Sequence, residues 1–466
     1  MKLLLLLCFA PTTWLVGQNT AKTQKDTVYS FTLKAAQDFA LTNNVTIKNN
    51  ELDIEIAKKK VWEITAIGLP QVTGSAGIQI MPDIPIQVIP NFISPAVVGT
   101  LVQNGLLPPS ALGKPANPEY IEAAFGTKYN NSFGIKVTQL IFDGSYIVGL
   151  QASRVYVELS KDQKKKTEIE IKEAIAQTYY LVNMIKDNLS ILDTSLLNIE
   201  KIADETSKIQ KAGFLDETDA EQIKLQTMFV QNQRNNIYRQ FVLAKNALKF
   251  QLGLNMSDSL VLTESLENVM ISSISENSIL TKELDIKNHI DFKILDTYEK
   301  SAKLQLRNEK FKYLPSLVAF YNFQKDNRSQ KMDFKVWHPT QVVGLSLSVP
   351  IFNSGMTHFR VQQAKLQLQK VKNSKYQVED GLKLSIQNNR STYIHALSQY
   401  KKNAEAKNLS EKIYKNTLKK FRAGTASSMD FTQAHSQYLN AQSQLITTML
   451  EVMNAKSNLN KALNNY

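Results

Sequence analysis

The feature that most constrains this chain is an internal duplication. The segment "KAGFLDETD" at residues 211–219 returns in related form as "RAGTASSMD" at residues 422–430, a shift of 211 positions. The same shift aligns identical residues further on: Gln222 with Gln433, Gln226 with Gln437, Ala244 with Ala455 and Leu248 with Leu459. A register kept over this length indicates one structural unit encoded twice.

A second pair of segments extends the duplication upstream. The stretch "FGIKVTQLIFDGS" (133–145) aligns with "VGLSLSVPIFNSG" (343–355) at a shift of 210, and both repeats also contain a stretch that opens with Leu-Pro, at 69 and at 314. We therefore expect a first structural repeat over 19–260 and a second over 261–466. Each is predicted to run helix, strand, loop, strand, long helix, turn, long helix.

Alternation of apolar and polar residues predicts the strands. Ile135 and Val137 would point to one side and Lys136 and Thr138 to the other, as expected for a strand with two different faces. Four such segments are expected, at about 69–80, 131–142, 314–325 and 341–352. Their length suits a tilted strand that crosses a membrane. The half-buried sheet of a soluble protein would give the same alternation, so the strands alone leave both interpretations open.

The helical segments are unusually long. Residues 356–421 contain no proline and only one glycine, Gly381, and from Met429 onward apolar residues recur every three or four positions, as in a coiled coil. The fold class is therefore mainly α, with two long coiled-coil helical hairpins interrupted by strand pairs. Four strands cannot close a membrane barrel, and lipid cannot satisfy open sheet edges. If the strands enter a membrane, several chains must pool them.

The first residues indicate export. Residues 1–18 have the layout of a signal peptide, with Lys2, a short apolar run and then small and polar residues. The only cysteine, Cys8, lies inside this run and follows Leu7, whereas a lipid-modified cysteine would normally follow a small residue. No later run is apolar enough for a membrane helix. The mature chain is expected in the periplasm, outside the cell or in a membrane that holds β-barrels.

The charge distribution argues against a nucleic-acid-binding protein, and the absence of catalytic motifs argues against an enzyme. The net charge of +13 comes from lysines spread along the chain among acidic residues, so solvated helix faces are favoured over nucleic-acid binding. The five histidines have no metal-ligand spacing, and no phosphate-binding glycine loop is present. We predict no enzyme activity, no cofactor and no metal. His435 is interpreted as a helix surface or packing residue.

Residues 81–120 are set apart by eight of the chain's 13 prolines in a largely uncharged stretch. This density of proline argues against a regular helix or a central strand. Two interpretations stay open: a long outward loop that caps the barrel, and a flexible insert.

These parts together resemble the TolC-like outer-membrane efflux protein family. The resemblance rests on the signal peptide, the two tandem halves, the strand pairs between long helices, the strand-to-helix segments "LIFDGS" and "PIFNSG", and the two turns with Asp six residues after Gly. It covers nearly the whole mature chain, about residues 28–466.

Membership in this family implies an assembly and partners. It implies a homotrimer whose twelve pooled strands form one β-barrel in outer-membrane lipid of a Gram-negative bacterium, with the helices continuing as a periplasmic α-barrel. It also implies a periplasmic adaptor (membrane fusion) protein and an inner-membrane pump of the resistance-nodulation-division or ABC type. The protein would be a passive exit duct in a tripartite efflux or type I secretion system, for drugs, metal ions or proteins.

The repeated corners would then be the two hairpin tips at the periplasmic end. Gly213 and Gly424 suit the left-handed position after a helix, and Asp219 and Asp430 suit a capping box at the start of the next helix. The resemblance adds a gate, in which Asp219 and Asp430 face the entrance and rings of like charge attract cations and favour their own protonation. The family's lock uses an Arg and a Tyr where this chain has Ala426 and Phe421, which puts an Arg lock in doubt. Phe421 would then be a hydrophobic gate contact or simple hairpin core.

The same family resemblance implies a set of adaptor contacts. The tip positions that contact the adaptor in this family are matched here by Gly213, Phe214, Gly424 and Thr425, although the glycines also serve the turn. A polar stripe on one helix face suits a water-filled lumen or an outer face exposed to solvent, and its members are Gln222, Gln226, Gln433 and Gln437.

The main alternative function is a periplasmic coiled-coil adaptor or scaffold without channel activity, which would need one hairpin flanked by compact β domains. A secreted filamentous protein would need uninterrupted heptads.

Overall fold

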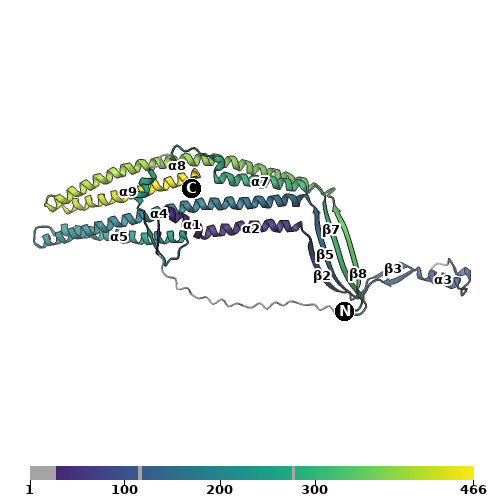
Figure 1. Ribbon diagram of the computed structural model, residues 1–466. Coiled ribbons are helices and arrows are strands. Elements are labelled where there is room, and N and C mark those ends of the chain that lie inside the picture. The colour runs from purple at the N-terminus through teal and green to yellow at the C-terminus, as the bar shows by residue number, and fades with distance from the viewer. Residues whose placement is uncertain (1–27, 114–117, 275–278) are drawn as a thin grey trace. The chain divides into compact units, whose positions relative to one another are not determined.

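The computed structural model describes residues 28–113, 118–274 and 279–466 (Figure 1). The expected signal peptide at 1–18 and Cys8 lie outside these residues. The described chain divides into two compact units, and each unit takes segments from both halves of the sequence. The first contains residues up to 48, 167–285 and 382–466, and the second contains 49–166 and 286–381.

The second unit is built around a four-stranded antiparallel sheet with the order β2-β5-β7-β8. Its strands are β2 (Gln71–Ile80), β5 (Tyr129–Phe142), β7 (Ser316–Ser329) and β8 (His338–Ser348). The strand expected at 341–352 therefore lies a few residues earlier. The chain leaves the ladder before Pro350, which has no N–H to donate. β2 and β8 are the edge strands of this sheet.

The same unit contains an insertion between β2 and β5. It consists of β3 (Ile86–Pro90), α3 (Ile93–Gln103), the short 3-10 helix η1 (Pro109–Ala111) and β4 (Tyr120–Ala124). The prediction that this proline-rich segment holds no regular helix is wrong. Pro95 lies in the first turn of α3, where a missing N–H costs nothing, and the next twelve residues contain no proline.

The helices of the second unit are α2 (Val45–Ile67) from Asn49 onward, α7 (Ile290–Phe311), and the first parts of α4 (Gly144–Lys211) and α8 (Met356–Arg422). Ion pairs and hydrogen bonds join them, as between Lys164 and Glu51 at 2.8 Å and between Lys300 and Glu158 at 2.9 Å. The long helix predicted over 356–421 is confirmed, because α8 ends one residue later, at Arg422.

The first unit holds two helical hairpins. One is formed by the rest of α4 with α5 (Glu217–Leu252), the other by the rest of α8 with α9 (Ser428–Ala462), and Figure 1 shows them side by side. Smaller elements pack beside them: β1 (Val28–Phe31), α1 (Leu33–Asn43), β6 (Ser259–Leu262) and α6 (Leu266–Ile274). The main core lies here, around fully buried Tyr179 of α4, whose hydroxyl donates to the Phe31 carbonyl at 3.2 Å.

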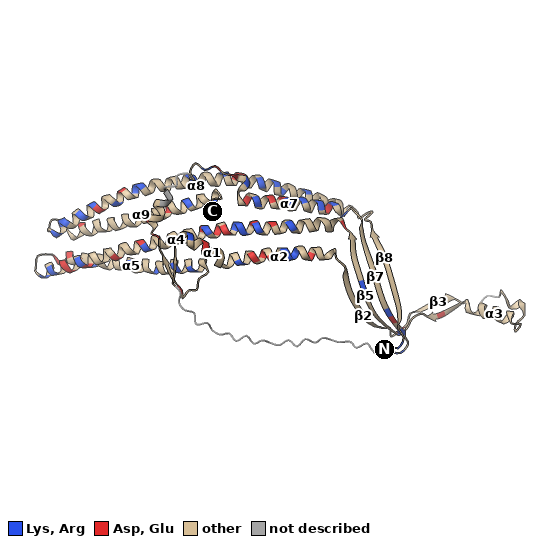
Figure 2. Ribbon diagram, viewed as in Figure 1, with Lys and Arg blue, Asp and Glu red and all other residues tan. Residues whose placement is uncertain are grey.

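Charged side chains are distributed unevenly along the elements. Figure 2 shows blue and red residues alternating along the helices, whereas the four-stranded sheet and the insertion with β3 and α3 are almost entirely tan. Among the described residues, no helix combines the length and apolar character needed to span a bilayer.

Candidate functional site

The four-stranded sheet has one apolar face that is open to its surroundings. Cross-strand partners share a face, and the register places Val72 and Ile78 of β2 on the same face as Val343, Leu345 and Leu347 of β8. These five side chains are between 61% and 80% exposed. A sheet that faces water on one side normally buries its apolar side chains against a core. Here the apolar face lacks a protein partner within the described chain.

The opposite face is mostly polar. Its residues include Thr73, Ser75 and Gln79 of β2, Ser132, Lys136 and Thr138 of β5, Asn322, Gln324 and Asp326 of β7, and Thr340, Ser346 and Ser348 of β8. The alternation predicted from the sequence is therefore confirmed. One apolar face and one polar face, with unpaired outer edges on β2 and β8, are what a segment of a membrane barrel requires.

The two hairpin tips are closed by the same backbone motif. Gly213 has φ of 81° and Gly424 has φ of 73°, in the left-handed region where glycine is favoured. The residue after each glycine donates its N–H back into the preceding helix, from Phe214 to Ile209 at 3.1 Å and from Thr425 to Lys420 at 2.9 Å. This is the Schellman arrangement, and it explains why the sequence of the corner is repeated.

The two predicted capping acids have different partners. Asp430 completes a capping box with Ser427, and the Ser427 hydroxyl and N–H lower the pKa of the Asp430 carboxyl. In the first tip, Asp216 caps α5 by accepting the Thr218 N–H at 2.9 Å. Asp219 instead crosses to the other hairpin and accepts from the backbone N–H of Ser428 at 3.2 Å and from its hydroxyl.

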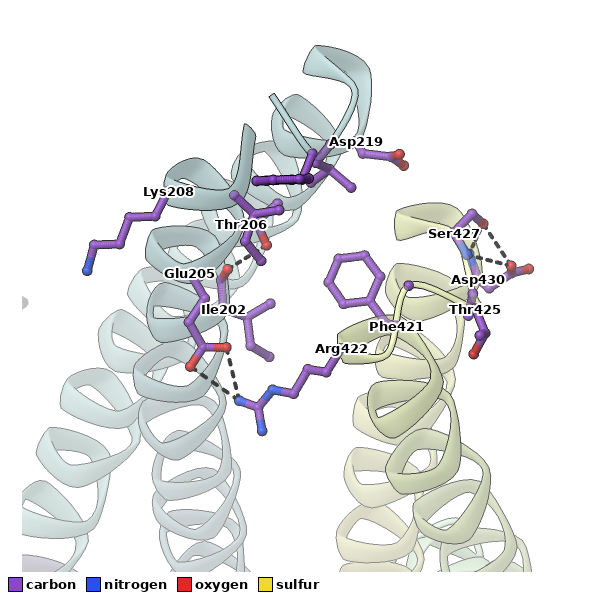
Figure 3. A pocket seen from close by; sticks show the side chains of 15 residues that line it. Ile202, Glu205, Thr206, Lys208, Asp219, Phe421, Arg422, Thr425, Ser427 and Asp430 are labelled. Carbon is purple, nitrogen blue, oxygen red and sulfur yellow. Dashed lines mark hydrogen bonds and ion pairs between the residues drawn. The ribbon is translucent and has the colours of Figure 1, made fainter. Parts of the chain in front are cut away.

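A second contact that joins the hairpins was not foreseen from the sequence. Figure 3 shows Arg422, at the end of α8, reaching toward Glu205 of α4, and the two side chains form an ion pair at 3.3 Å. Together the tips line a cavity of about 880 Å³, which includes Asp219, Phe421 and Thr425. Arg422 lies directly before the repeated Ala-Gly, but its partner is 217 residues away, so the sequence offered no signal for the pair.

Phe421 packs between the two hairpins. Its ring stacks on Phe431 of α9 with centroids 5.2 Å apart, and it borders the cluster formed by buried Ile199, Ile202 and Ile223. Ile199 and Ile202 belong to α4 and Ile223 to α5, so Phe421 is part of a core that the two hairpins share. Phe214 has the opposite environment, because 85% of it is exposed at the first tip.

A polar contact network lies deeper between the hairpins. His435 of α9 is 2% exposed, and its Nε2 lies 2.8 Å from the hydroxyl of Ser195 on α4. Its ring stacks on Phe431, with centroids 5.9 Å apart, and Gln226 of α5 approaches its Nδ1 at 3.4 Å. Burial lowers the pKa of His435 to about 4. Of the two predicted alternatives, helix surface and packing, the burial of His435 supports packing, and the bonds that it makes to the first hairpin were not predicted.

The glutamines of the predicted stripe differ between the two halves. Gln222 and Gln226 of α5 are partly buried and bond to Ser428 and Ser436 of α9, at 2.8 and 3.1 Å. Gln433 and Gln437 of α9 lie outside these contacts between the hairpins. Among the described residues, no group of three or more His, Cys, Asp or Glu side chains is arranged to hold a metal ion.

Solved structures share this fold over most of its length. CmeC, an outer membrane channel of Campylobacter jejuni, is 16% identical, with a TM-score of 0.69 over 95% of this chain and 90% of CmeC. CusC is 14% identical, with a TM-score of 0.69 over 92% and 91% of the two chains. VceC, an outer membrane protein of Vibrio cholerae, is 14% identical, with a TM-score of 0.67 over 92% and 95%. At these identities the likeness concerns the fold.

The sheet, the paired hairpins and these structures define an outer-membrane channel fold. No curated protein matches the chain. The family model described as outer membrane efflux protein matches residues 286–465, most of the second repeat. This match and the shared fold confirm the resemblance to TolC-like proteins. The family is one of channels rather than enzymes, and these matches do not favour a periplasmic adaptor or scaffold.

Proposed function

We propose that this protein is the outer-membrane channel of a tripartite efflux or type I secretion system. The observation that carries the proposal is the four-stranded sheet with one exposed apolar face, one polar face and two free edges. Such a sheet becomes stable in lipid when β2 of one copy pairs with β8 of the next. Three copies give 3 × 4 = 12 strands, with the apolar face against outer-membrane lipid and the polar face around water.

The hairpins extend into the periplasm in this proposal, and their tips form the inner entrance. Asp219, Asp430 and Phe421 are the gate candidates. Asp219 is the strongest of the three, because it alone among them hydrogen-bonds to the other hairpin, by accepting from Ser428. Asp430 caps its own helix and acts on the gate through the stability of the second hairpin. Phe421 adds an apolar contact to the cluster of Ile199, Ile202 and Ile223 on the first hairpin.

The tips also supply the proposed contact with a periplasmic adaptor, through Gly213, Phe214, Gly424 and Thr425. An inner-membrane pump of the resistance-nodulation-division or ABC type would provide the energy, and this protein would act without catalysis as a passive duct. Gln433 and Gln437 of α9 are the better lumen candidates, because Gln222 and Gln226 are occupied between the hairpins.

The test is reconstitution of detergent-purified protein into planar lipid bilayers. We expect discrete current steps of uniform size and extraction of the protein from outer membranes only with detergent. Deletion of the gene should sensitise cells to exported compounds, and the wild-type gene should restore resistance. A mature protein that is soluble without detergent and produces no current would refute the channel.

A further inference from the structure

The described part of the insertion between β2 and β5, residues 81–113 and 118–126, is here called the outer extension, and its surface is one that a water-exposed loop should not have. Residues 84–113 contain no charged residue. Large apolar side chains with at least half of their surface exposed cover it: Ile86, Val88, Phe92, Ile93, Val97, Leu106 and Leu112. Exposed apolar side chains concentrated in one segment in this way mark a contact with another molecule.

The extension presents these side chains from an ordered backbone. β3 and β4 pair over five residues, and the Phe125 N–H donates to the Pro85 carbonyl at 3.3 Å at the base. Asn91, only 6% exposed, organises the start of α3: its side chain accepts the Ser94 N–H at 3.0 Å and donates to the Pro118 carbonyl at 2.9 Å. α3 itself contains no buried residue. The apolar surface is therefore preformed, and the flexible-insert interpretation is not supported.

The position of the extension argues against lipid as its partner. It follows the end of the sheet where Asn131 of β5 and Lys325 and Asn327 of β7 interrupt the apolar face, and Figure 1 shows β3 and α3 beyond that end. Charged and amide side chains at this level mark the border of the apolar membrane band. A segment that continues past this border lies in the polar layer or in water, where its apolar side chains need a protein partner.

The connectivity favours a second copy of this chain as that partner. The extension begins directly after β2, the edge strand whose outer side must pair with β8 of a neighbouring copy in the proposed trimer. Each extension is thus anchored at a seam between copies, and all three leave the barrel at the same end. Their uncharged surfaces can approach one another without electrostatic repulsion.

We propose that the outer extensions of neighbouring copies pack against one another through α3 and β3 and form an apolar cap over the outer mouth of the channel. This inference rests on the proposed function, because it requires the pooled barrel. The cap narrows the outer mouth, so disrupting it enlarges the opening without altering the gate at the hairpin tips.

Disulfide trapping tests the contact. The chain's only cysteine, Cys8, lies in the predicted signal peptide, so single-cysteine variants of the mature protein can be made directly. We expect Phe92→Cys, Val97→Cys and Leu106→Cys, oxidised in intact cells, to give covalent dimers for at least one position. The control is Lys331→Cys, exposed in the turn between β7 and β8 at the same end of the sheet but outside the extension, which should stay monomeric in a denaturing gel.

A charge substitution tests whether the cap narrows the outer mouth of the channel. Val97→Asp should repel its copies and raise single-channel conductance in planar bilayers several-fold, whereas Gln103→Asp, at an already polar exposed position of α3, should leave it unchanged. Channels that conduct normally but show no cross-link at any position and no effect of Val97→Asp would overturn the cap alone.

Fluorescence separates a protein partner from lipid. A fluorophore attached to the thiol of the Val97→Cys variant should be shielded from lipid-borne quenchers when the protein is reconstituted in vesicles. Quenching of this fluorophore by the lipid-borne groups would overturn the cap, because α3 would then lie in the bilayer. A monomeric protein without current would overturn both the cap and the channel.

Discussion

His435 on α9 lies 2.8 Å from the hydroxyl of Ser195 on α4, so a buried imidazole ties the second hairpin to the first. Burial lowers the pKa of this ring to about 4, whereas an unfolded chain takes up the proton at about pH 6.5. Between these pH values the unfolded state binds more protons than the folded state. The free energy of unfolding should therefore be at its full value above pH 6.5 and fall by roughly 3 kcal/mol as the pH decreases to 4.

Thermal unfolding of the wild type and of His435→Gln between pH 7.5 and 4 checks this expectation. The variant, which cannot titrate, should lose part of the acid dependence. His395→Gln, at an exposed position of α8, should keep all of it. Equal acid dependence in all three proteins would show that groups other than His435 determine how the free energy of unfolding changes with pH.

Asp219 should hold the tips together more than Asp430 does. In Asp219→Ala, the fully buried Ser428 loses the acceptor of its N–H, at a cost of about 1–3 kcal/mol, and the hairpins separate more easily. We expect a higher open probability in planar bilayers. The control is Ser427→Ala, which removes the α9 cap at a cost of about 1 kcal/mol but cuts no contact between hairpins. If both variants raised the current equally, helix stability rather than the Asp219 contact would govern opening.

Lys136 should set the charge preference of the barrel. It lies exposed in the middle of β5 on the polar face, opposite Thr73 and Asn322, whereas Asp326 and Arg328 lie at one end of β7. Three copies would form a ring of positive charge that favours anions. Reversal potentials in a salt gradient should shift toward cations in Lys136→Glu and stay unchanged in Lys136→Arg. An unaltered potential in Lys136→Glu would remove this residue from the lumen.

Phe214 should contribute to docking of the adaptor rather than to the stability of the fold. Because 85% of it is exposed, Phe214→Ala should change the free energy of unfolding by no more than about 0.5 kcal/mol. The same substitution should reduce resistance in cells, where an adaptor must dock. A photoreactive side chain at position 214 should capture a periplasmic protein that the same group at Leu225, also exposed but further along α5, does not. Full resistance of Phe214→Ala cells would contradict the docking role.

Local patterns in the sequence predicted much of this fold. Alternation located the strands, the absence of proline located α8, and Gly213 and Gly424 located the tips, because each of these signals lies within a few neighbouring residues. The pairing order β2-β5-β7-β8 and the parallel pairing of the four-residue strands β1 and β6 depend on long-range contacts that no local pattern records.

In the candidate site too, contacts between near neighbours in the sequence could be predicted and long-range contacts could not. The capping box at Asp430 could be predicted, because its partner is three residues away. The bond from Asp219 to Ser428 and the partial burial of Gln226 could not, because they join segments 209 and 210 residues apart. Identical residues at equivalent positions of the two repeats therefore acquire different environments. Helix α3 was missed because proline density was averaged over a segment whose middle lacks proline.

The most direct test of the central claim is cryo-electron microscopy of the detergent-purified protein. We expect three copies around one axis, with β2 of each hydrogen-bonded to β8 of the next in a closed barrel of twelve strands. A monomer, or an assembly in which the edges of β2 and β8 stay unpaired, would contradict the channel.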